Sequence, residues 1–499
     1  MSQGTTAIAN GCSPPYYFDG GNRILNRKNK CNILFFVCDT LRADRLSSYG
    51  YFRKTSPNID TLANEGILFE KHYCSGISTG NAFTSIFTGL PAISHKYYAT
   101  PARAFNIARF DDTIPTLPEI IQSNTDYSTI AIDNLINFAG HMNQTARGFQ
   151  FYLNPTRESG FPHPEYHAGE ANEMLIPWLR QYGKKPFFAF VHYWDPHHTP
   201  YSAPGYRTRF QQEHNRYDGL PIKKANAGYE YVPGWGRVED MYWGVSISEK
   251  AQQVDAQVDG GFGGSVKADK TEKSISQDLY DCSIAYMDHQ ISEILSVLKQ
   301  ENILDNTIII ITADHGEGLG NHGVWGHGLL YEDTIHIPLI MWQPNVFKHK
   351  KRVKSFTQHV DLAPTIMDLI GIPDSSVCRL GDRYSWQKKG SGDVAVQMEG
   401  HTLIPLTTDQ PAKIRDSAIT EVRRGPKDPG FRSIIDEDNW KLIRKLNGDM
   451  QLYNLDNDPM EKINLATSEP SRLKDLSKKL DDWVQNHIRD TGIDPMAEW

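Results

Sequence analysis

The sequence predicts an α/β protein in which helices sandwich a large, mostly parallel sheet, with a smaller antiparallel sheet towards the C-terminus. Three continuous apolar runs predict the large sheet, because such runs are typical of strands buried on both faces: Asn32–Asp39, Phe187–Tyr193 and Asn306–Ala313. Amphipathic segments with helical spacing lie between these runs, as expected for helices that cover such a sheet. Short alternating runs near the C-terminus predict the second sheet.

Between the first two buried runs, the sequence indicates further helices and one short strand. Ser56–Phe69 is read as a helix, with Pro57 near its start and Gly66 at its end, because proline favours the first helical turn and glycine the position after the last. The remaining elements expected here are a helix at Leu117–Gln122, a strand at Ser128–Ile132 and a helix at Asn172–Tyr182.

The segment Ser202–Ile275 differs from its surroundings, because it is rich in Gly, Tyr and Lys and contains the linker-like sequence DGGFGGS. We interpret it as an insertion that acts as a lid or a substrate-selecting segment. Its aromatic side chains could line a pocket or form a small core of their own. Apolar residues at three- and four-residue spacing then predict an amphipathic helix at Gln277–Lys299.

The C-terminal part alternates short apolar runs with polar turns, which is typical of an antiparallel sheet. The expected strands are Ser417–Val422, Phe431–Ile435, Trp440–Arg444 and Gln451–Asn454. A final amphipathic helix, Leu473–Ile488, is expected to pack its apolar face on this sheet. We therefore expect an N-terminal extension (1–30), a large catalytic domain (31–410) that carries the insertion 202–275, and a C-terminal subdomain (411–499).

Composition and charge exclude several classes of protein. The net charge of −8 gives no electrostatic footprint for nucleic acid. No run approaches the roughly 20 apolar residues that a membrane-spanning helix needs, and the mean hydropathy is −0.50. The N-terminus lacks the apolar segment of a signal peptide, and the six cysteines show no metal-binding spacing. We therefore expect reduced thiols and a cytoplasmic protein without membrane insertion.

Each of the three buried runs ends in residues that can bind a metal ion or a phosphate group. These residues are Asp39, Asp195 with His197 and His198, and Asp314 with His315. Because the carboxyl ends of parallel strands meet at one edge of a sheet, we expect these side chains to share one crevice. His327 follows in a glycine-rich stretch that can bend back to the same place. The adjacent histidines could also be ordinary loop residues.

The stretch STGNAFTSIFTG, residues 78–89, reads as a nucleophile at the start of a helix. Thr79 would lie where unpaired backbone N–H groups and the helix dipole favour an anion, and Gly80 lets a substrate approach the backbone. A hydroxyl in this position can attack a phosphate or sulfate ester. Ser78 or Thr79 could instead serve only as a helix cap.

Several stretches together resemble the sulfatase family of the alkaline phosphatase superfamily, from Ile33 to about Ala466. They are CDTLRADRLSSYG, SPNIDTLANEGILFEKHY, SIFTGLP, NTIIIITADHGEGLGNHG, GHGLLYEDTIHIPLI, HVDLAPTIMDLIG and QLYNLDNDPMEKINLA. The resemblance implies an alkaline phosphatase-like fold and a metal-dependent hydrolase that acts on phosphate or sulfate esters.

The sequence departs from the family pattern at the nucleophile. Sulfatases of this family convert a Cys or Ser to formylglycine and carry an Arg shortly after it, whereas Thr79 and Phe83 stand at these places. Asn134 and Ile136 replace the Lys and His that the family carries after the next strand. Threonine cannot form the aldehyde. A threonine at this position resembles the branches of the superfamily that form a phosphothreonine, such as phosphodiesterases and phosphoglycerol or phosphoethanolamine transferases. This resemblance implies a phosphodiesterase or a phosphonate monoester hydrolase.

The combined hypothesis is that a divalent metal (Mn, Zn or Ca) activates Thr79, which attacks phosphorus and is then released by water. The expected metal ligands are Asp39, Asp314, His315 and Thr79. The expected catalytic residues are Thr79, His327 and His198, and the expected substrate-binding residues are His197, Asn134, Asn81 and Arg42. Alternatively, Asp195, one of the WDPHH histidines and His327 hold a second metal, which would make the reaction a two-metal displacement.

The expected substrate is a small anionic ester, and the chain is compatible with a homo-oligomer. Three other functions compete with a phosphate-ester hydrolase: a sulfatase that acts without formylglycine, a transferase that passes the phosphoryl group to an alcohol, and a noncatalytic binding protein. The joint retention of the strand-end acids, the histidines and Thr79 disfavours the last of these.

Overall fold

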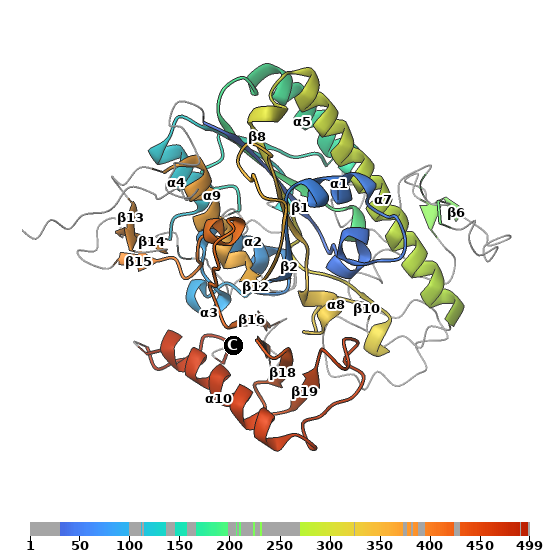
Figure 1. Ribbon diagram of the computed structural model, residues 1–499, viewed down its shortest axis with the longest axis vertical. Coiled ribbons are helices and arrows are strands. Elements are labelled where there is room, and N and C mark those ends of the chain that lie inside the picture. Colours follow the sequence, from blue (N-terminus) through green and yellow to red (C-terminus); the bar gives the residue numbers. More distant parts are fainter. Residues whose placement is uncertain are drawn as a thin grey trace, which may run out of the picture.

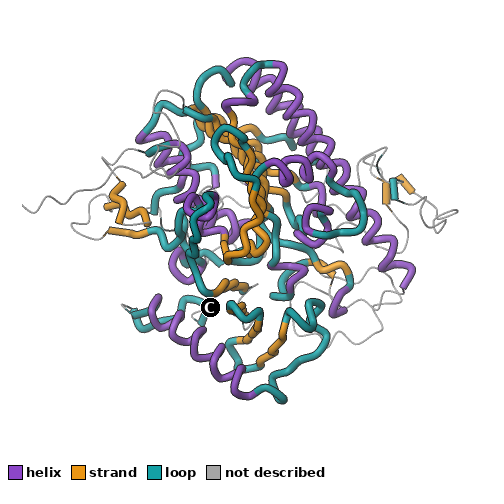
Figure 2. The backbone as a smooth tube through the Cα atoms, in the orientation of Figure 1, coloured by secondary structure: helices purple, strands orange, loops and turns teal. Residues whose placement is uncertain are grey.

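The computed structural model of the chain describes residues 30–98, 111, 114–135, 145–156, 166–197, 206, 209–210, 223–224, 230–231, 270–323, 325–372, 377–380, 383–387, 395–423, 430–489 and 491–497. Its main body is a large sheet between two layers of helices, and a smaller sheet with one long helix lies beneath it (Figure 1; Figure 2). Nearly all of the expected N-terminal extension and most of the expected insertion 202–275 lie outside the described residues.

The large sheet has eight strands in the order β12-β2-β11-β8-β1-β5-β3-β4. Their bounds are β1 Asn32–Cys38, β2 Ile67–Tyr73, β3 Ser128–Ile132, β4 Phe151–Leu153, β5 Phe187–Tyr193, β8 Thr307–Thr312, β11 Leu339–Trp342 and β12 Lys351–Gln358. All neighbouring strands pair in parallel, except that β11 runs antiparallel to β2 and β8. The central strands β1, β5 and β8 are buried along their whole length, which confirms the prediction of a mostly parallel sheet.

Helices cover both faces of this sheet. One face carries α2, Thr79–Thr88, α4, Leu117–Asn124, and α9, Leu362–Ile370. The opposite face carries α1, Pro57–Glu65, α5, Ala168–Tyr182, and the long α7, Lys270–Gln300, which packs against both of the others. The sheet and these six helices form the sandwich that the sequence predicts.

Shorter elements complete the described parts of the chain. They are the helices α3 Ala92–His95 and α8 Glu332–Ile335, the 3-10 turns Ala43–Arg45, Ser47–Tyr49, Leu304–Asn306, Asn321–Gly323, His359–Asp361 and Ile404–Thr407, and the strands β6 Lys223–Lys224, β7 Glu230–Tyr231, β9 Gly318–Leu319, β10 Trp325–Gly326, β13 Val377–Leu380, β14 Arg383–Gln387 and β15 Ala395–Gln397. No helix in the described part of the chain is long and apolar enough to cross a bilayer.

The reading of Ser56–Phe69 as one helix is wrong at its end. Helix α1 stops at Glu65, and the chain continues as strand β2 from Ile67. Gly66 makes this change possible because β11 comes very close: a Cβ at this position would lie 2.4 Å from the carbonyl oxygen of Met341.

The C-terminal sheet is an antiparallel meander of four strands, β16 Ser417–Val422, β17 Phe431–Asp436, β18 Trp440–Lys445 and β19 Met450–Asn454. Helix α10, Pro470–His487, packs on one face of it (Figure 1). The shared core consists of Ile419, Ile434, Leu442 and Leu452 from the strands and Leu476 and Leu480 from the helix. This arrangement confirms the predicted antiparallel sheet, with the apolar face of the last helix packed on it.

Candidate active site

Three side chains converge where strands β1 and β8 end. Asp39 follows β1, and Asp314 and His315 follow β8, its parallel neighbour in the sheet. All three side chains are fully buried, and one potential ligand atom from each lies within 4.8 Å of the other two. The parallel pairing explains this convergence, since it brings the carboxyl ends of both strands to the same edge.

Local hydrogen bonds fix the orientation of Asp314 and His315. Oδ1 of Asp314 accepts hydrogen bonds from the backbone N–H groups of Thr40 and His315, at 3.0 and 2.7 Å. The Nδ1 atom of His315 lies 3.0 Å from the carbonyl oxygen of Gly316, which can only accept, so Nδ1 carries the proton. Its Nε2 atom therefore carries an unprotonated lone pair and lies 3.3 Å from Oδ2 of Asp314.

The chemistry of this donor set fits a divalent cation. Oδ1 of Asp39, Oδ2 of Asp314 and Nε2 of His315 are buried and have no hydrogen-bond partner. Such atoms are costly when they are unpaired, and three lone-pair donors that face one another repel unless a positive charge lies between them. Two carboxylate oxygens and one imidazole nitrogen suit Mn²⁺ or Zn²⁺.

Thr79 is the first residue of helix α2, and its hydroxyl points to this cluster. Its Oγ1 atom donates a hydrogen bond of 3.3 Å to Oδ2 of Asp39. The preceding Ser78 has a φ of +90° and makes no side-chain cap hydrogen bond, so capping does not account for the two hydroxyls of this segment. The structure thus brings together all four residues expected as metal ligands.

His192 of β5 connects Asp39 to a second acid. Its Nε2 atom lies 3.3 Å from Oδ2 of Asp39, and its Nδ1 atom lies 2.8 Å from Oδ1 of Asp133. Burial alone would lower the pKa of His192, but hydrogen bonds to Asp133 and Asp39 raise it to about 9. Burial raises the pKa of Asp39, and the nearby charge of Asp314 raises it further. The imidazole of His192 therefore links Asp39 to Asp133.

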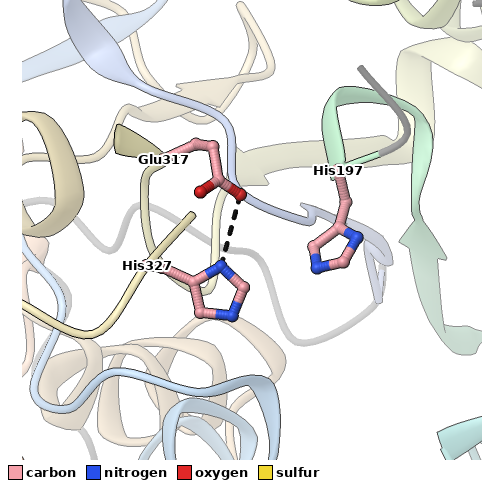
Figure 3. Close-up of side chains that lie close together, drawn as sticks. All are labelled: His197, Glu317 and His327. Atoms are coloured by element: carbon pink, nitrogen blue, oxygen red, sulfur yellow. Dashed lines mark hydrogen bonds and ion pairs between the residues drawn. The ribbon is translucent and has the colours of Figure 1, made fainter. Parts of the chain in front are cut away.

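A second cluster consists of His197, Glu317 and His327, whose potential ligand atoms lie within 4.8 Å of one another (Figure 3). The short hairpin β9–β10 pairs Gly318 with Gly326, so the next positions, Glu317 and His327, lie opposite each other. Nδ1 of His327 lies 3.2 Å from Oε2 of Glu317. His197 approaches from the turn after β5, with its ring towards His327 (Figure 3).

The two clusters lie next to each other. The ring centroids of His315 and His327 are 4.2 Å apart, and those of His197 and His327 are 5.5 Å apart. Burial alone would lower the pKa of His327, but the Glu317 carboxylate outweighs it and leaves the pKa above its usual range. The two clusters therefore combine carboxylates and imidazoles beside the Thr79 hydroxyl, and such groups together can bind and transfer an anionic group.

Asp195 does not join either cluster, contrary to the expected second metal site. Its Oδ2 atom accepts a 2.7 Å hydrogen bond from the N–H group of Ala168, and its Oδ1 atom lies 3.1 Å from Nδ1 of His167. Helix α5 begins at Ala168, so Asp195 satisfies an N–H group at a helix start and stabilises the helix dipole. Glu317, and not Asp195, lies beside His197 and His327.

Two of the residues expected to bind substrate, Asn134 and Arg42, contact other groups of the protein. Asn134 donates to Thr156 Oγ1 and accepts from the indole N–H of Trp194. The Arg42 guanidinium, only 2% exposed, contacts Asp44, Asp333 and the carbonyl oxygen of Glu317, which indicates a structural role.

Asn81 lies in the first turn of α2, is 1% exposed, and has no hydrogen-bond partner for either amide atom. His198 lies outside the described residues. The sequence reasoning did not identify Glu317 or His192 as site residues; the position of Glu317 two residues after His315, in a segment already singled out, was the available signal.

Comparisons with known proteins identify the family and the fold. A family model described as Sulfatase matches residues 31–372. The chain is 24% identical to the N-acetylglucosamine-6-O-sulfatase of Bacteroides thetaiotaomicron, over 93% of this chain and 88% of that protein. It is 22% identical to the multifunctional alkaline phosphatase superfamily protein PehA of Trinickia caryophylli, over 91% of this chain and 95% of that protein. The phosphonate monoester hydrolase of Agrobacterium radiobacter has a similar fold, with a TM-score of 0.66, 20% identity, and 92% and 96% of the chains covered.

Proposed function

The chain belongs to the sulfatase family of the alkaline phosphatase superfamily, and on that premise we propose that it hydrolyses phosphate-type esters through a phosphothreonine on Thr79. The proposed substrate is a small anionic phosphodiester or phosphonate monoester. The observation that supports this proposal is the convergence of three unpartnered metal-binding atoms, from Asp39, Asp314 and His315, beside the hydroxyl of Thr79.

In the first step, Oγ1 of Thr79 forms a bond to phosphorus while the bond to the leaving alcohol breaks. Oδ2 of Asp39, which already accepts the hydrogen bond of this hydroxyl, is the nearest acceptor for its proton. The leaving oxygen takes a proton from solvent and departs as an alcohol. Asp39, Asp314 and His315 would hold a divalent cation, which would supply Lewis acidity that lowers the pKa of a nearby hydroxyl and withdraws charge from the phosphoryl group.

In the second step, water attacks the phosphothreonine, the bond between phosphorus and Oγ1 breaks, and the Thr79 hydroxyl is restored. Backbone N–H groups at the start of α2 stabilise charge on the transferred group in both steps. His327 and His197 lie next to the first cluster and serve to bind the oxygens of the transferred group. The amide of Asn81 has no partner in the protein and is a further group that can bind these oxygens.

Threonine favours phosphorus over sulfur as the target. A phosphothreonine can be cleaved by water at phosphorus, so the side chain needs no aldehyde. The second candidate function is a sulfatase that works without formylglycine, and its support is the sulfatase activity named for the relative from Bacteroides thetaiotaomicron. Transfer of the phosphoryl group to an alcohol in place of water uses the same first step.

The test is a substrate panel with the purified, metal-free protein and with added Mn²⁺, Zn²⁺ or Ca²⁺. Aryl phosphodiester, aryl phosphonate, aryl phosphomonoester and aryl sulfate are compared at equal concentration. We expect metal-dependent release of the phenol, fastest from the phosphodiester or the phosphonate. Mass spectrometry of acid-quenched protein should locate a phosphoryl group on the peptide that contains Thr79. Turnover of the sulfate alone would contradict the proposal and support the second candidate.

A further inference from the structure

Strand β16 is the edge of the C-terminal sheet that contacts the large sheet (Figure 1), and it holds the segment that leads into helix α2. The N–H group of Glu421 donates to the carbonyl oxygen of Ser75 at 3.1 Å, and the N–H group of Ile77 donates to the carbonyl oxygen of Glu421 at 3.2 Å. The hydroxyl of Thr420 donates a hydrogen bond of 2.6 Å to the carbonyl oxygen of Cys74. The chain just before α2 is thus bonded to the C-terminal subdomain.

This segment touches the first turn of α2 directly. Gly76, the bridge partner of Glu421, lies so close to Asn81 that a Cβ at Gly76 would be 2.4 Å from Oδ1 of Asn81. Ser78, between the bridge and the helix, has a φ of +90°, which residues other than glycine rarely adopt. Such a conformation persists only where surrounding contacts hold it, and the bonds to β16 are contacts of this kind. A change in these bonds would therefore displace Thr79, the next residue.

The side chain of Glu421 holds the other end of the same helix. Glu421 is only 1% exposed, and its Oε2 atom accepts a 2.9 Å hydrogen bond from the N–H group of Ile93 in helix α3. Helix α3 contacts α2, and Nε2 of its His95 lies 3.1 Å from the Ser85 hydroxyl of α2. The Oε1 atom accepts separately, from Nε of Arg432 at 2.8 Å. The charge pair with Arg432 therefore does not explain why Oε2 faces α3.

We propose that Glu421 is a positioning residue, which holds both ends of α2 and thereby fixes the Thr79 hydroxyl beside Asp39. The proposal rests on the function proposed above, because it gives the C-terminal subdomain a part in that reaction. The nucleophile must approach phosphorus in line, and a displacement of about 1 Å can lower a rate by about 10²-fold. Loss of the Glu421 carboxylate should therefore lower kcat and leave KM nearly unchanged.

The experiment measures kcat and KM for the aryl phosphodiester, with Mn²⁺, Zn²⁺ or Ca²⁺ added to the whole protein. We expect Glu421→Ala to lower kcat by about 10- to 100-fold and to change KM by less than about threefold. Glu421→Gln keeps an oxygen for the N–H group of Ile93, so it should retain kcat within about threefold although it loses the charge pair with Arg432. Asp494→Asn is the matched control, because Asp494 is the other carboxylate that binds Arg432. It should lower the Tm and leave kcat close to that of the wild type.

Hydrogen exchange of backbone amides, followed by mass spectrometry, tests the same proposal without turnover. The peptide that spans residues 75–82 should exchange at least about 10-fold faster in Glu421→Ala than in the wild type, and at the wild-type rate in Asp494→Asn. If Glu421→Ala does not fold, Thr420→Val takes its place in both measurements, because valine has the shape of threonine and only the hydrogen bond to Cys74 is lost. It should lower kcat by at least about threefold.

Wild-type kcat or wild-type exchange in Glu421→Ala would overturn the proposal, and in its absence the same results in Thr420→Val would do so. A loss of kcat in Glu421→Gln or Asp494→Asn equal to that in Glu421→Ala would also overturn it, because the effect would then follow the charge pair. If the wild type hydrolyses none of the four esters, the proposed function fails, and the exchange rates alone decide whether Glu421 holds α2.

Discussion

The hydroxyl oxygen of Thr79 lies 3.3 Å from Oδ2 of Asp39, although 40 residues separate them in the chain. Asp39 ends the central strand β1, and Thr79 starts helix α2, which covers one face of the sheet. The same Asp39 oxygen lies 3.3 Å from Nε2 of His192, whereas Oδ1 has no partner. Asp39 thus uses one oxygen to orient its neighbours and leaves the other without a hydrogen-bond partner.

Replacement of Thr79 tests the nucleophile. We expect Thr79→Ala to lower kcat on the best substrate by on the order of 10³-fold or more, because the attacking atom is lost. The free energy of unfolding should change by no more than about 1 kcal/mol, since the side chain is half-buried. Thr79→Ser keeps a hydroxyl and should keep measurable turnover. Thr61→Ala, which removes an exposed hydroxyl on α1, is the control, and full activity in Thr79→Ala would disprove the assignment.

Asp314 should have a much larger effect on stability with metal than without it. In the metal-free protein, repulsion from Asp39 opposes the favourable charges of His315 and His192 on Asp314, so Asp314→Asn should change the free energy of unfolding little. Metal at 100 times its Kd should stabilise the wild type by about 2.7 kcal/mol and the variant by much less. Thermal unfolding with and without Mn²⁺ measures both effects. A wild-type Tm that does not respond to any of the three metals would contradict a metal site here.

The sequence predicted the centre of the large sheet well and its edge poorly. Strands β1, β5 and β8 are long apolar runs, because both faces are buried. Strand β12 at the edge alternates exposed and buried positions and contains three cationic residues, and β11 has only four residues. Neither carries a local signal that separates it from a loop, since its pairing depends on partners far away in the chain.

The site was predictable where a residue directly follows a buried strand. Asp39, Asp314 and His315 meet because parallel strands end at one edge. Glu317 joins His327 only through the register of the β9–β10 hairpin, which no turn motif in the sequence specifies. Asp195 follows a buried strand too, but its partner is the N–H group of Ala168 at the start of helix α5. The sequence pattern predicted that this helix starts only at Asn172, so the contact with Ala168 could not be foreseen.

Asp195→Ala should therefore affect stability and leave metal binding intact. The variant leaves the buried N–H group of Ala168 without its acceptor and removes a negative charge from a helix start. We expect the free energy of unfolding to fall by about 1–3 kcal/mol in urea titrations. The number of bound metal ions should equal that of the wild type. Loss of one equivalent would show that Asp195 is a ligand after all.

Lys441 should anchor the C-terminal sheet to the segment that follows His327. Its fully buried ammonium lies 3.0 Å from Glu332 at the start of α8 and 2.7 Å from Glu461. Lys441→Met leaves two carboxylates without their counter-charge, so it should destabilise the protein by about 3–5 kcal/mol in urea. The double variant Lys441→Met, Glu461→Gln should recover part of this loss. A loss in the free energy of unfolding smaller than that of a typical surface substitution would contradict the anchoring role of Lys441.

His95 should make the protein less stable in acid. Nδ1 of His95 accepts from the N–H group of Tyr97, and Nε2 contacts the Ser85 hydroxyl, so the buried ring is neutral. Burial lowers its pKa to about 3, whereas an unfolded histidine has a pKa of about 6.5. Between these values the unfolded chain binds the extra proton. The contribution of His95 is thus complete above about pH 6.5 and falls by up to about 1.4 kcal/mol per pH unit below it.

Urea unfolding of the wild type and His95→Gln at pH 7.5, 6 and 5 measures this contribution. We expect the stability difference between the two proteins to shrink as the pH falls, because glutamine does not titrate and only the wild type loses stability at this position. His289→Gln, which replaces an exposed histidine on α7, should leave the pH dependence close to that of the wild type. Parallel curves for the wild type and His95→Gln would mean that His95 takes up a proton in the folded protein as readily as in the unfolded chain.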